Sequence, residues 1–144
     1  MDGDLEIQLN QIPELIKNFE SNDKDVLVGM RWENNKHVFS NINSFGNYLI
    51  NGIFNFLFKS NFHDVLCCVR ILDKELFKSL KIKSLRFSIE AETLAKLVLK
   101  KVSIEQVLIH YKRRSVKEGK KLKLKDGWSI VIQIIKLRIN PNNS

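Results

Sequence analysis

Short apolar runs alternate along this chain with amphipathic segments of helical period, and that alternation is the strongest constraint on its fold. Alternating strands and helices predict an α/β fold with a mixed sheet flanked by helices, rather than a sandwich or a helical bundle. The expected strands are 25–30, 66–72 and 105–111. The expected helices are 12–19, 44–58, 74–80, 89–101 and 127–137. No repeat or linker divides the 144 residues, which predicts one domain.

The helix expected over 44–58 has two distinct faces. One is a polar stripe of asparagines spaced four residues apart, and the other is apolar. The stripe comprises Asn43, Asn47, Asn51 and Asn55, and the apolar face comprises Leu49, Ile50, Ile53, Phe54 and Leu57. Asp73 directly precedes the next expected helix, where its side chain is suited to cap the first turn.

The positive charge is concentrated in one short segment. The chain has a net charge of +8, and residues 112–125 contain eight Lys and Arg against the single Glu118, a local net charge of +7. Such a segment indicates an anionic partner. Phosphate groups and non-specifically bound nucleic acid both fit this charge. No aromatic side chain interrupts the segment, so a platform for stacking bases is not evident.

The cysteines and histidines give no sign of a metal site or a disulfide. Cys67 and Cys68 are adjacent, so they are poorly placed to bond to each other and are expected to be reduced and buried, as in a cytoplasmic protein. His37, His63 and His110 share no metal-binding spacing and are expected at the surface or at strand ends. The first residues are acidic, unlike a signal peptide, and no uninterrupted apolar run reaches the ~20 residues of a membrane span.

Three acidic residues, Asp2, Asp4 and Glu6, alternate with other residues at the start of the chain. Hard oxygen ligands suit Mg²⁺ or Mn²⁺, which commonly bind a few carboxylates together with substrate phosphates. Taken alone, the same pattern fits a solvated turn. Together with the basic segment, it suits a metal-bound diphosphate: the acidic residues would bind the metal, and the basic segment would bind the phosphates.

The acidic and basic segments belong to a series of short motifs that covers nearly the whole chain. They are Asp2–Glu6, Val28–Arg31, Phe45–Asn47 with Asn51, Asp64 with Cys67 and Arg70, Phe87 with Glu90 and Glu92, Tyr111–Arg114, Lys117–Lys121 and Leu124–Trp128. In this order they resemble family-2 glycosyltransferases of the polyprenyl (dolichyl)-phosphate mannosyl- and glucosyltransferase type. Cys68 and Val69 depart from that family's pattern, which has a glycine and an aromatic residue there.

The resemblance implies a partial glycosyltransferase A-type, Rossmann-like mixed sheet that lacks the N-terminal nucleotide-binding half. Residues 1–144 would form one truncated domain. Its parts would be a metal-site and central-strand region (1–40), acceptor-side helices and strands (41–111), and a basic loop with a C-terminal amphipathic helix (112–144). The implied activity is an inverting, metal-assisted transfer of a sugar from a nucleotide-sugar donor to a polyprenyl-phosphate lipid. The expected location is cytoplasmic, peripheral at the inner face of the membrane.

The resemblance also implies residue roles. Asp2, Asp4 and Glu6 would hold Mg²⁺ or Mn²⁺ on the donor diphosphate. Asp64 would be the catalytic residue, orienting the acceptor phosphate or acting as a base, although capping a turn is its simpler role. Donor and acceptor phosphates would be bound by Arg31, Arg70, Arg114, Lys120 and Lys121.

Three alternatives remain open at this point. The chain could be an inactive remnant, or one half of a split glycosyltransferase that assembles with a separately encoded N-terminal half. It could also be a small basic nucleic-acid-binding protein, although the glycosyltransferase interpretation expects no nucleic acid. Trp128 and the series Ile130, Val131, Ile132, Ile134 and Ile135 are expected in the core. The alternative is a helix on a membrane surface, with Lys136 and Arg138 facing lipid head groups.

Overall fold

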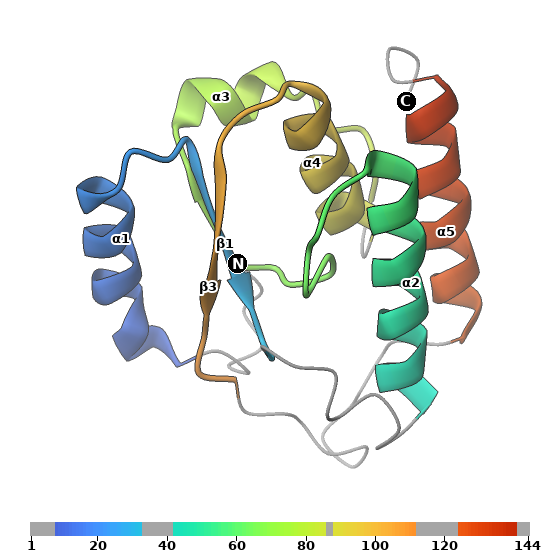
Figure 1. Cartoon of the computed structure of the whole chain (residues 1–144), viewed down its shortest axis with the longest axis horizontal. Helices are drawn as coiled ribbons and strands as arrows, with labels where there is room; N and C mark the ends of the chain where they lie inside the picture. The colour runs from blue at the N-terminus through green and yellow to red at the C-terminus, as the bar shows by residue number, and fades with distance from the viewer. Residues whose placement is uncertain (1–7, 33–41, 86–87, 112–123, 141–144) are drawn as a thin grey trace.

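The computed structural model describes residues 8–32, 42–85, 88–111 and 124–140, which form a small mixed sheet flanked by helices (Figure 1). The strands are β1 (Val26–Met30), β2 (Arg70–Leu72) and β3 (Ile104–Leu108). Their order in the sheet is β2-β1-β3, with β1 antiparallel to β2 and parallel to β3. The predicted mixed α/β class is therefore confirmed.

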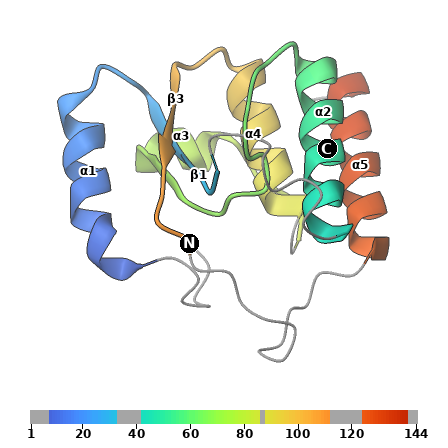
Figure 2. The same cartoon turned by 60° about the horizontal axis from the view of Figure 1, so that its bottom comes forward.

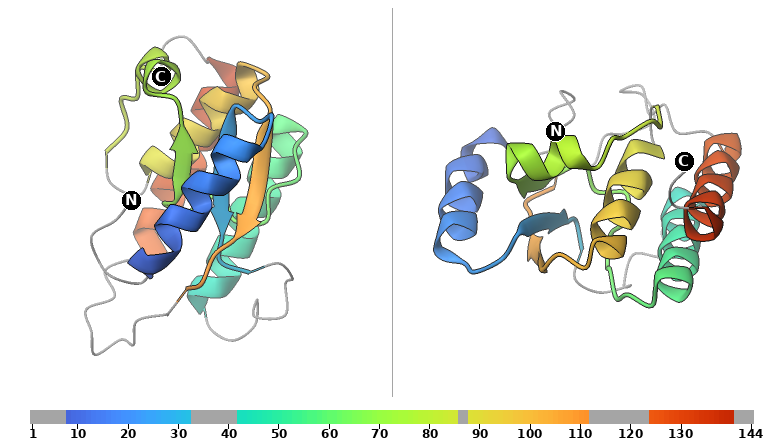
Figure 3. Two further views of the ribbon diagram at one scale, coloured as in Figure 1. Left: turned by 90° about the vertical axis from the view of Figure 1, so that its left-hand side faces the viewer. Right: turned by 90° about the horizontal axis from the view of Figure 1, so that it is seen from above.

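The helices lie on both sides of this sheet. Helix α1 covers one face, whereas α2, α4 and α5 lie on the other side (Figures 2 and 3). All five predicted helices are present, with small differences at their ends. Their bounds are α1 (Ile12–Ser21), α2 (Ile42–Phe58), α3 (Lys74–Ser79), α4 (Ser88–Leu99) and α5 (Leu124–Ile139), and a short 3-10 helix, η1 (Leu9–Gln11), precedes α1. As predicted, the Asp73 carboxylate caps α3 by accepting from the N–H of Glu75 at 2.7 Å.

Strand β1 is the centre of the packing because both of its faces are covered. Val26 and Val28 belong to the cluster formed with α2, α4 and α5, whereas Leu27 packs with Leu15 of α1 on the opposite face. Successive side chains of a strand point to opposite faces, so a strand buried on both sides has to be apolar throughout. This explains the uninterrupted apolar run of β1.

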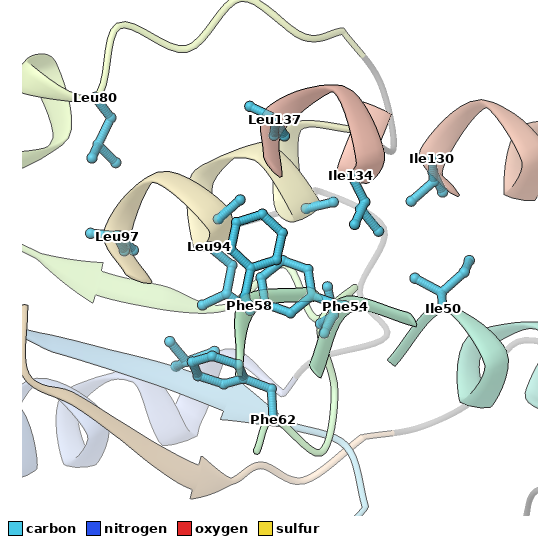
Figure 4. Close-up of a cluster of buried hydrophobic side chains, with 14 of the residues drawn as sticks. Ile50, Phe54, Phe58, Phe62, Leu80, Leu94, Leu97, Ile130, Ile134 and Leu137 are labelled. Carbon is cyan, nitrogen blue, oxygen red and sulfur yellow. The ribbon is translucent and has the colours of Figure 1, made fainter. Parts of the chain in front are cut away.

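The larger core lies between α2, α4 and α5 (Figure 4). Phe54 and Phe58 of α2 stack with ring centroids 4.6 Å apart, and Phe62 meets Phe54 edge-on at 5.9 Å. Other fully or nearly fully buried members are Ile50, Leu80, Leu94, Leu97, Ile130, Ile134 and Leu137. No helix in the described part of the chain is long and apolar enough to cross a membrane.

Gly29 allows the chain before β2 to approach β1 closely. A β-carbon at this position would lie 2.9 Å from Cβ of Val69, which is too close, and 3.1 Å from Cγ2 of Ile109, which is a tight contact. The N–H of Gly29 donates to the carbonyl of Val69 at 2.9 Å. The glycine is therefore required by space and not by an unusual backbone conformation.

Two predictions about burial and strand length were wrong. The strand expected over 66–72 is reduced to Arg70–Leu72, because an apolar run indicates burial rather than extended pairing. Trp128, Ile132 and Ile135 are 72 %, 51 % and 39 % exposed instead of lying in the core. Cys67 is buried and Cys68 is half-buried, and both are free thiols.

Glu92 is a buried carboxylate that joins α4 to the chain before it. Its side chain is inaccessible to solvent and contacts the ammonium of Lys96 at 2.5 Å. It also accepts from the backbone N–H groups of Lys83 and Ser84, at 3.1 and 2.6 Å. Burial by itself raises the pKa of Glu92, but the hydrogen bonds from Lys96, Ser84 and Lys83 outweigh burial and lower the pKa below its ordinary value.

We predict that Glu92→Gln lowers the free energy of unfolding at pH 7 by about 2–4 kcal/mol, because Lys96 loses its buried counterion. Glu75→Gln is the matched control, since Glu75 pairs with Lys78 on an exposed helix surface, and it should cost less than about 1 kcal/mol. Urea unfolding measures both. Equal losses would contradict a special role for Glu92.

The difference between wild type and Glu92→Gln should also depend on pH. The folded-state pKa of Glu92 is lowered, so its charge stabilises the fold fully above the ordinary glutamate value of 4.5. That contribution is lost as the pH falls through the folded-state pKa. We therefore expect the two unfolding free energies to converge in acid, and a difference that does not change with pH would contradict this.

Candidate functional site

The carboxyl ends of β1 and β3 bring together several residues singled out from the sequence. The two strands are parallel, so both end at the same edge of the sheet. Arg31 and Trp32 follow β1, and Tyr111 follows β3 by three residues. In open α/β sheets this edge is the usual place for ligands.

Arg31 and Asp64 form a two-point ion pair at this edge. Nε and Nη2 of Arg31 donate to the two carboxylate oxygens of Asp64 at 2.6 and 2.7 Å. The backbone N–H of Arg31 donates to the same carboxylate at 3.1 Å. The side chains are 15 % and 1 % exposed, respectively. The two residues are 33 positions apart, and both were predicted to belong to the site.

The pair fixes the charge of Arg31. Burial alone lowers the pKa of a guanidinium, but the negative charge of Asp64 and its hydrogen bonds outweigh burial and raise the pKa of Arg31 above its ordinary value. Arg31 is therefore a permanent cation. Asp64 engages two of the five N–H donors that a guanidinium carries.

Two asparagines of α2 hold the loop that presents Asp64. The amide of Asn51 donates to the carbonyl of His63 at 2.6 Å and accepts from the N–H of Val65 at 2.9 Å. The amide of Asn55 donates to the carbonyl of Phe62 and accepts from the N–H of the same residue, both at 2.8 Å. A side-chain amide can replace a peptide group in this way, so α2 binds the loop as a neighbouring strand would.

Gln106 of β3 ties the same loop to the sheet. Its amide accepts from the N–H of His63 at 2.8 Å and donates to the carbonyl of Asn61 at 2.9 Å. Asp64 is thus placed between a helix and a strand by three side-chain amides. A residue held this firmly can orient Arg31 with little freedom of its own.

Two aromatic rings cover the guanidinium of Arg31. Its central carbon lies 4.7 Å from the ring centroid of Trp32 and 5.3 Å from that of Tyr111. The rings meet edge-on, with centroids 5.7 Å apart. Cation–π contacts of this kind stabilise a guanidinium and restrict its orientation.

Gln11 brings the start of the described chain to this edge. Its amide donates to the carbonyl of His110 at 3.0 Å and accepts from the N–H of His110 at 2.9 Å. Gln11 lies close in sequence to the acidic residues 2–6, and His110 lies close to the basic segment. The described residues that follow the acidic segment therefore lie beside the described residues that precede the basic segment.

Arg70 is directed toward the protein interior. Its Nη2 donates to the carbonyl of Val65 at 3.2 Å, and its Nε is buried without a hydrogen-bond partner among the described residues. Burial lowers the pKa of the Arg70 guanidinium, and the negative charge of Glu90 offsets part of that effect. The predicted phosphate contact of Arg70 stays a prediction.

Cys67 is unsuited to act as a nucleophile. Burial, and then the negative charge of Asp64, raise the pKa of its thiol to about 12. The thiol is therefore neutral at physiological pH, whereas the thiolate is the reactive form.

The remaining predicted site residues lie outside the described residues. These are the metal ligands Asp2, Asp4 and Glu6 and the phosphate-binding residues Arg114, Lys120 and Lys121. Within the described ranges, no group of three His, Cys, Asp or Glu residues could hold a metal ion. Mg²⁺ or Mn²⁺ at the acidic residues therefore stays a prediction.

Sequence reasoning missed the residues that support the ion pair. Trp32, Gln106 and Gln11 were not singled out, and the Asn stripe was interpreted as a polar helix face, with Asn47 and Asn51 also part of the resemblance, but without any hydrogen-bond role. One signal was available: Asn51 and Asn55 recur on a helix with no charged residue. Polar side chains on such an apolar helix indicate specific hydrogen bonds.

Comparisons with known proteins gave no match: no protein-family model fits the chain, and searches of curated proteins and of solved structures found nothing similar. Any function therefore has to be proposed from the residues and their geometry.

We predict that Asn51→Ala lowers the free energy of unfolding by about 2–3 kcal/mol, because the N–H of Val65 and the carbonyl of His63 lose their shared partner. Asn47→Ala is the matched control, one helical turn earlier on α2 and half-buried, and it should stay within about 0.5 kcal/mol of wild type. Urea unfolding measures both variants. A small effect of Asn51→Ala would show that its amide does not hold the Asp64 loop.

Proposed function

We propose that the chain is a glycosyltransferase of the family-2, polyprenyl-phosphate type, with a partial glycosyltransferase A-type sheet. The observation that carries this proposal is the meeting of Arg31 and Asp64, both singled out by the resemblance, at the carboxyl edge of two parallel strands. The described flanks of the acidic and basic segments lie at the same edge, joined by Gln11 and His110. This arrangement supports one anion-binding site.

In the proposed reaction, an oxygen of the acceptor phosphate attacks the anomeric carbon of the sugar. The bond from that carbon to the donor diphosphate breaks, and the configuration at the carbon inverts. Arg31 is held in a fixed orientation by Asp64, Trp32 and Tyr111, so it can bind a phosphate oxygen without reorganising. Asp64 acts as a positioning residue, because both of its oxygens accept from Arg31.

Asp2, Asp4 and Glu6 would hold Mg²⁺ or Mn²⁺, because three carboxylates form a hard oxygen donor set. When bound, such a cation stabilises the negative charge of the departing nucleoside diphosphate. Arg114, Lys120 and Lys121 would add positive charge around the phosphates. A phosphate acceptor is already an anion, so it needs positioning more than a strong base.

The partners of this reaction would be a nucleotide sugar and a polyprenyl-phosphate lipid. A lipid acceptor places the chain at the inner face of the cytoplasmic membrane, as a peripheral protein.

The second candidate is one half of a split glycosyltransferase. Within the described residues, β2 pairs only with β1 and forms an edge of the sheet. Unpaired strand edges accept strands from other chains. A separately encoded N-terminal half could pair there and complete the donor site. An inactive remnant would bind neither the nucleotide sugar nor the polyprenyl-phosphate lipid.

We predict that the chain binds UDP or GDP only when Mn²⁺ is present. Arg31→Lys should weaken this binding at least about tenfold, because a lysine cannot reproduce the two-point guanidinium contacts. Arg138→Lys makes the same change at an exposed position of α5 and should have no effect. Isothermal titration calorimetry gives the affinities, and Asp4→Ala should abolish the metal dependence.

Sugar transfer to polyprenyl phosphate, followed as label entering the organic phase, separates the two candidates. Turnover by the chain alone supports the complete enzyme and refutes the split and remnant alternatives. Metal-dependent nucleotide binding without turnover favours the split enzyme. Absence of any metal-dependent binding to either diphosphate would overturn the proposed function.

A further inference from the structure

Helix α2 exposes an apolar stripe on the side away from the core. Phe45, Tyr48, Leu49 and Phe56 are 42 %, 44 %, 47 % and 83 % exposed. Their spacing places them on one face of the helix. The 17 residues of α2 include no charged side chain, so nothing on this helix opposes burial of the stripe in an apolar medium.

Helix α5 exposes a second apolar stripe. Trp128, Ile132, Ile135 and Ile139 are 72 %, 51 %, 39 % and 78 % exposed. They recur at intervals of four, three and four residues, opposite the face through which α5 enters the core. A helix that is apolar on two opposite faces has more apolar surface than the core of this protein covers.

The two stripes form one surface. Helices α2 and α5 lie side by side at the end of the molecule opposite α1 (Figures 1 and 2). A groove of about 490 Å³ separates them, with Tyr48 and Phe56 on one side and Val131 and Ile135 on the other. We call the eight exposed residues of the two stripes the α2–α5 surface. Contiguous apolar surfaces of this kind mark interaction sites.

The charged side chains of α5 from Gly127 onward are all basic. At 100° per residue, Lys136 and Arg138 lie on opposite sides of the α5 stripe, and both are exposed. From Gly127 onward α5 carries no acidic residue, and α2 carries none at all. Long basic side chains that flank an apolar stripe can extend to phosphates while their stems cover apolar area.

We propose that the α2–α5 surface binds a lipid bilayer that contains anionic head groups. The aromatic and aliphatic side chains enter the interface, and Lys136 and Arg138 contact head-group phosphates. A second copy of the chain fits less well, because stacking two such surfaces brings four cations together without an acidic partner on α2 or on α5 from Gly127 onward. α2 and α5 both begin at the end of the molecule where β1 ends (Figure 1), so the bilayer lies beside the candidate site.

This inference extends the lipid acceptor of the proposed function, but it can be tested independently of it. Vesicles of phosphatidylcholine with about 30 % phosphatidylglycerol are the probe, without nucleotide, metal or polyprenyl phosphate. In co-sedimentation, wild type should bind them at least about tenfold more strongly than pure phosphatidylcholine vesicles. If the vesicles are not bound, the proposed nucleotide binding is unaffected. If nucleotide is not bound, the proposed vesicle binding is unaffected.

The variant Phe56→Asp with Ile139→Asp should reduce vesicle binding at least about tenfold. Leu9→Asp with Ile16→Asp is the matched control: it adds the same charge at exposed apolar positions beside and on α1, at the opposite end, and should bind as wild type does. Lys136→Gln with Arg138→Gln should remove the preference for anionic vesicles, whereas Lys17→Gln with Lys24→Gln should keep it.

Three results would overturn the proposal. One is equal loss of binding in the two aspartate double variants. Another is equal binding of wild type to both vesicle types. The third is no vesicle binding together with a stable dimer that Phe56→Asp with Ile139→Asp dissociates, which would assign the surface to a second copy of the chain. Circular dichroism of each variant establishes that it is folded.

Discussion

Burying the carboxylate of Asp64, whose side chain is 1 % exposed, is costly unless a partner matches its charge, and Arg31 is that partner. The contact ties the end of β1 to a loop that follows α2, and the rest of the candidate site builds on it. Asn51, Asn55 and Gln106 hold the loop, while Trp32 and Tyr111 restrict the guanidinium. A fixed cation results at the edge of the sheet where the strands β1 and β3 both end.

The elements of this fold could be predicted from the sequence where apolar residues form an uninterrupted run or recur at helical spacing. β1 was predicted from its apolar run, and α4 because its apolar residues recur at helical spacing. The same reasoning overestimated the strand before Leu72. Residues 64–69 are buried or half-buried, but the N–H of Val65 bonds to the side chain of Asn51, and the N–H of Cys67 bonds to the carbonyl of Asp64. Burial can be inferred from hydrophobicity, whereas the hydrogen-bond partner cannot.

The candidate site was predictable in its members but not in its contacts. Asp64 and Arg31 were both singled out, yet their pairing depends on the fold, since 33 residues separate them. Asp64 was expected to orient the acceptor phosphate or to act as a base, whereas in the structure both of its oxygens accept from Arg31. Helix α5 shows the opposite limit: Ile130 and Ile134 are buried as expected, but Trp128 is exposed. An apolar helix read from sequence does not reveal which of its faces the protein covers.

A double-mutant cycle between Arg31 and Asp64, measured by urea unfolding, tests the central claim most directly. We expect Arg31→Gln and Asp64→Asn to cost about 3 kcal/mol each, because each leaves a buried charge without its partner. The double variant should lose less than the sum, with a coupling energy of about 2 kcal/mol or more. Additive losses, with a coupling below about 0.5 kcal/mol, would show that the site does not depend on this ion pair.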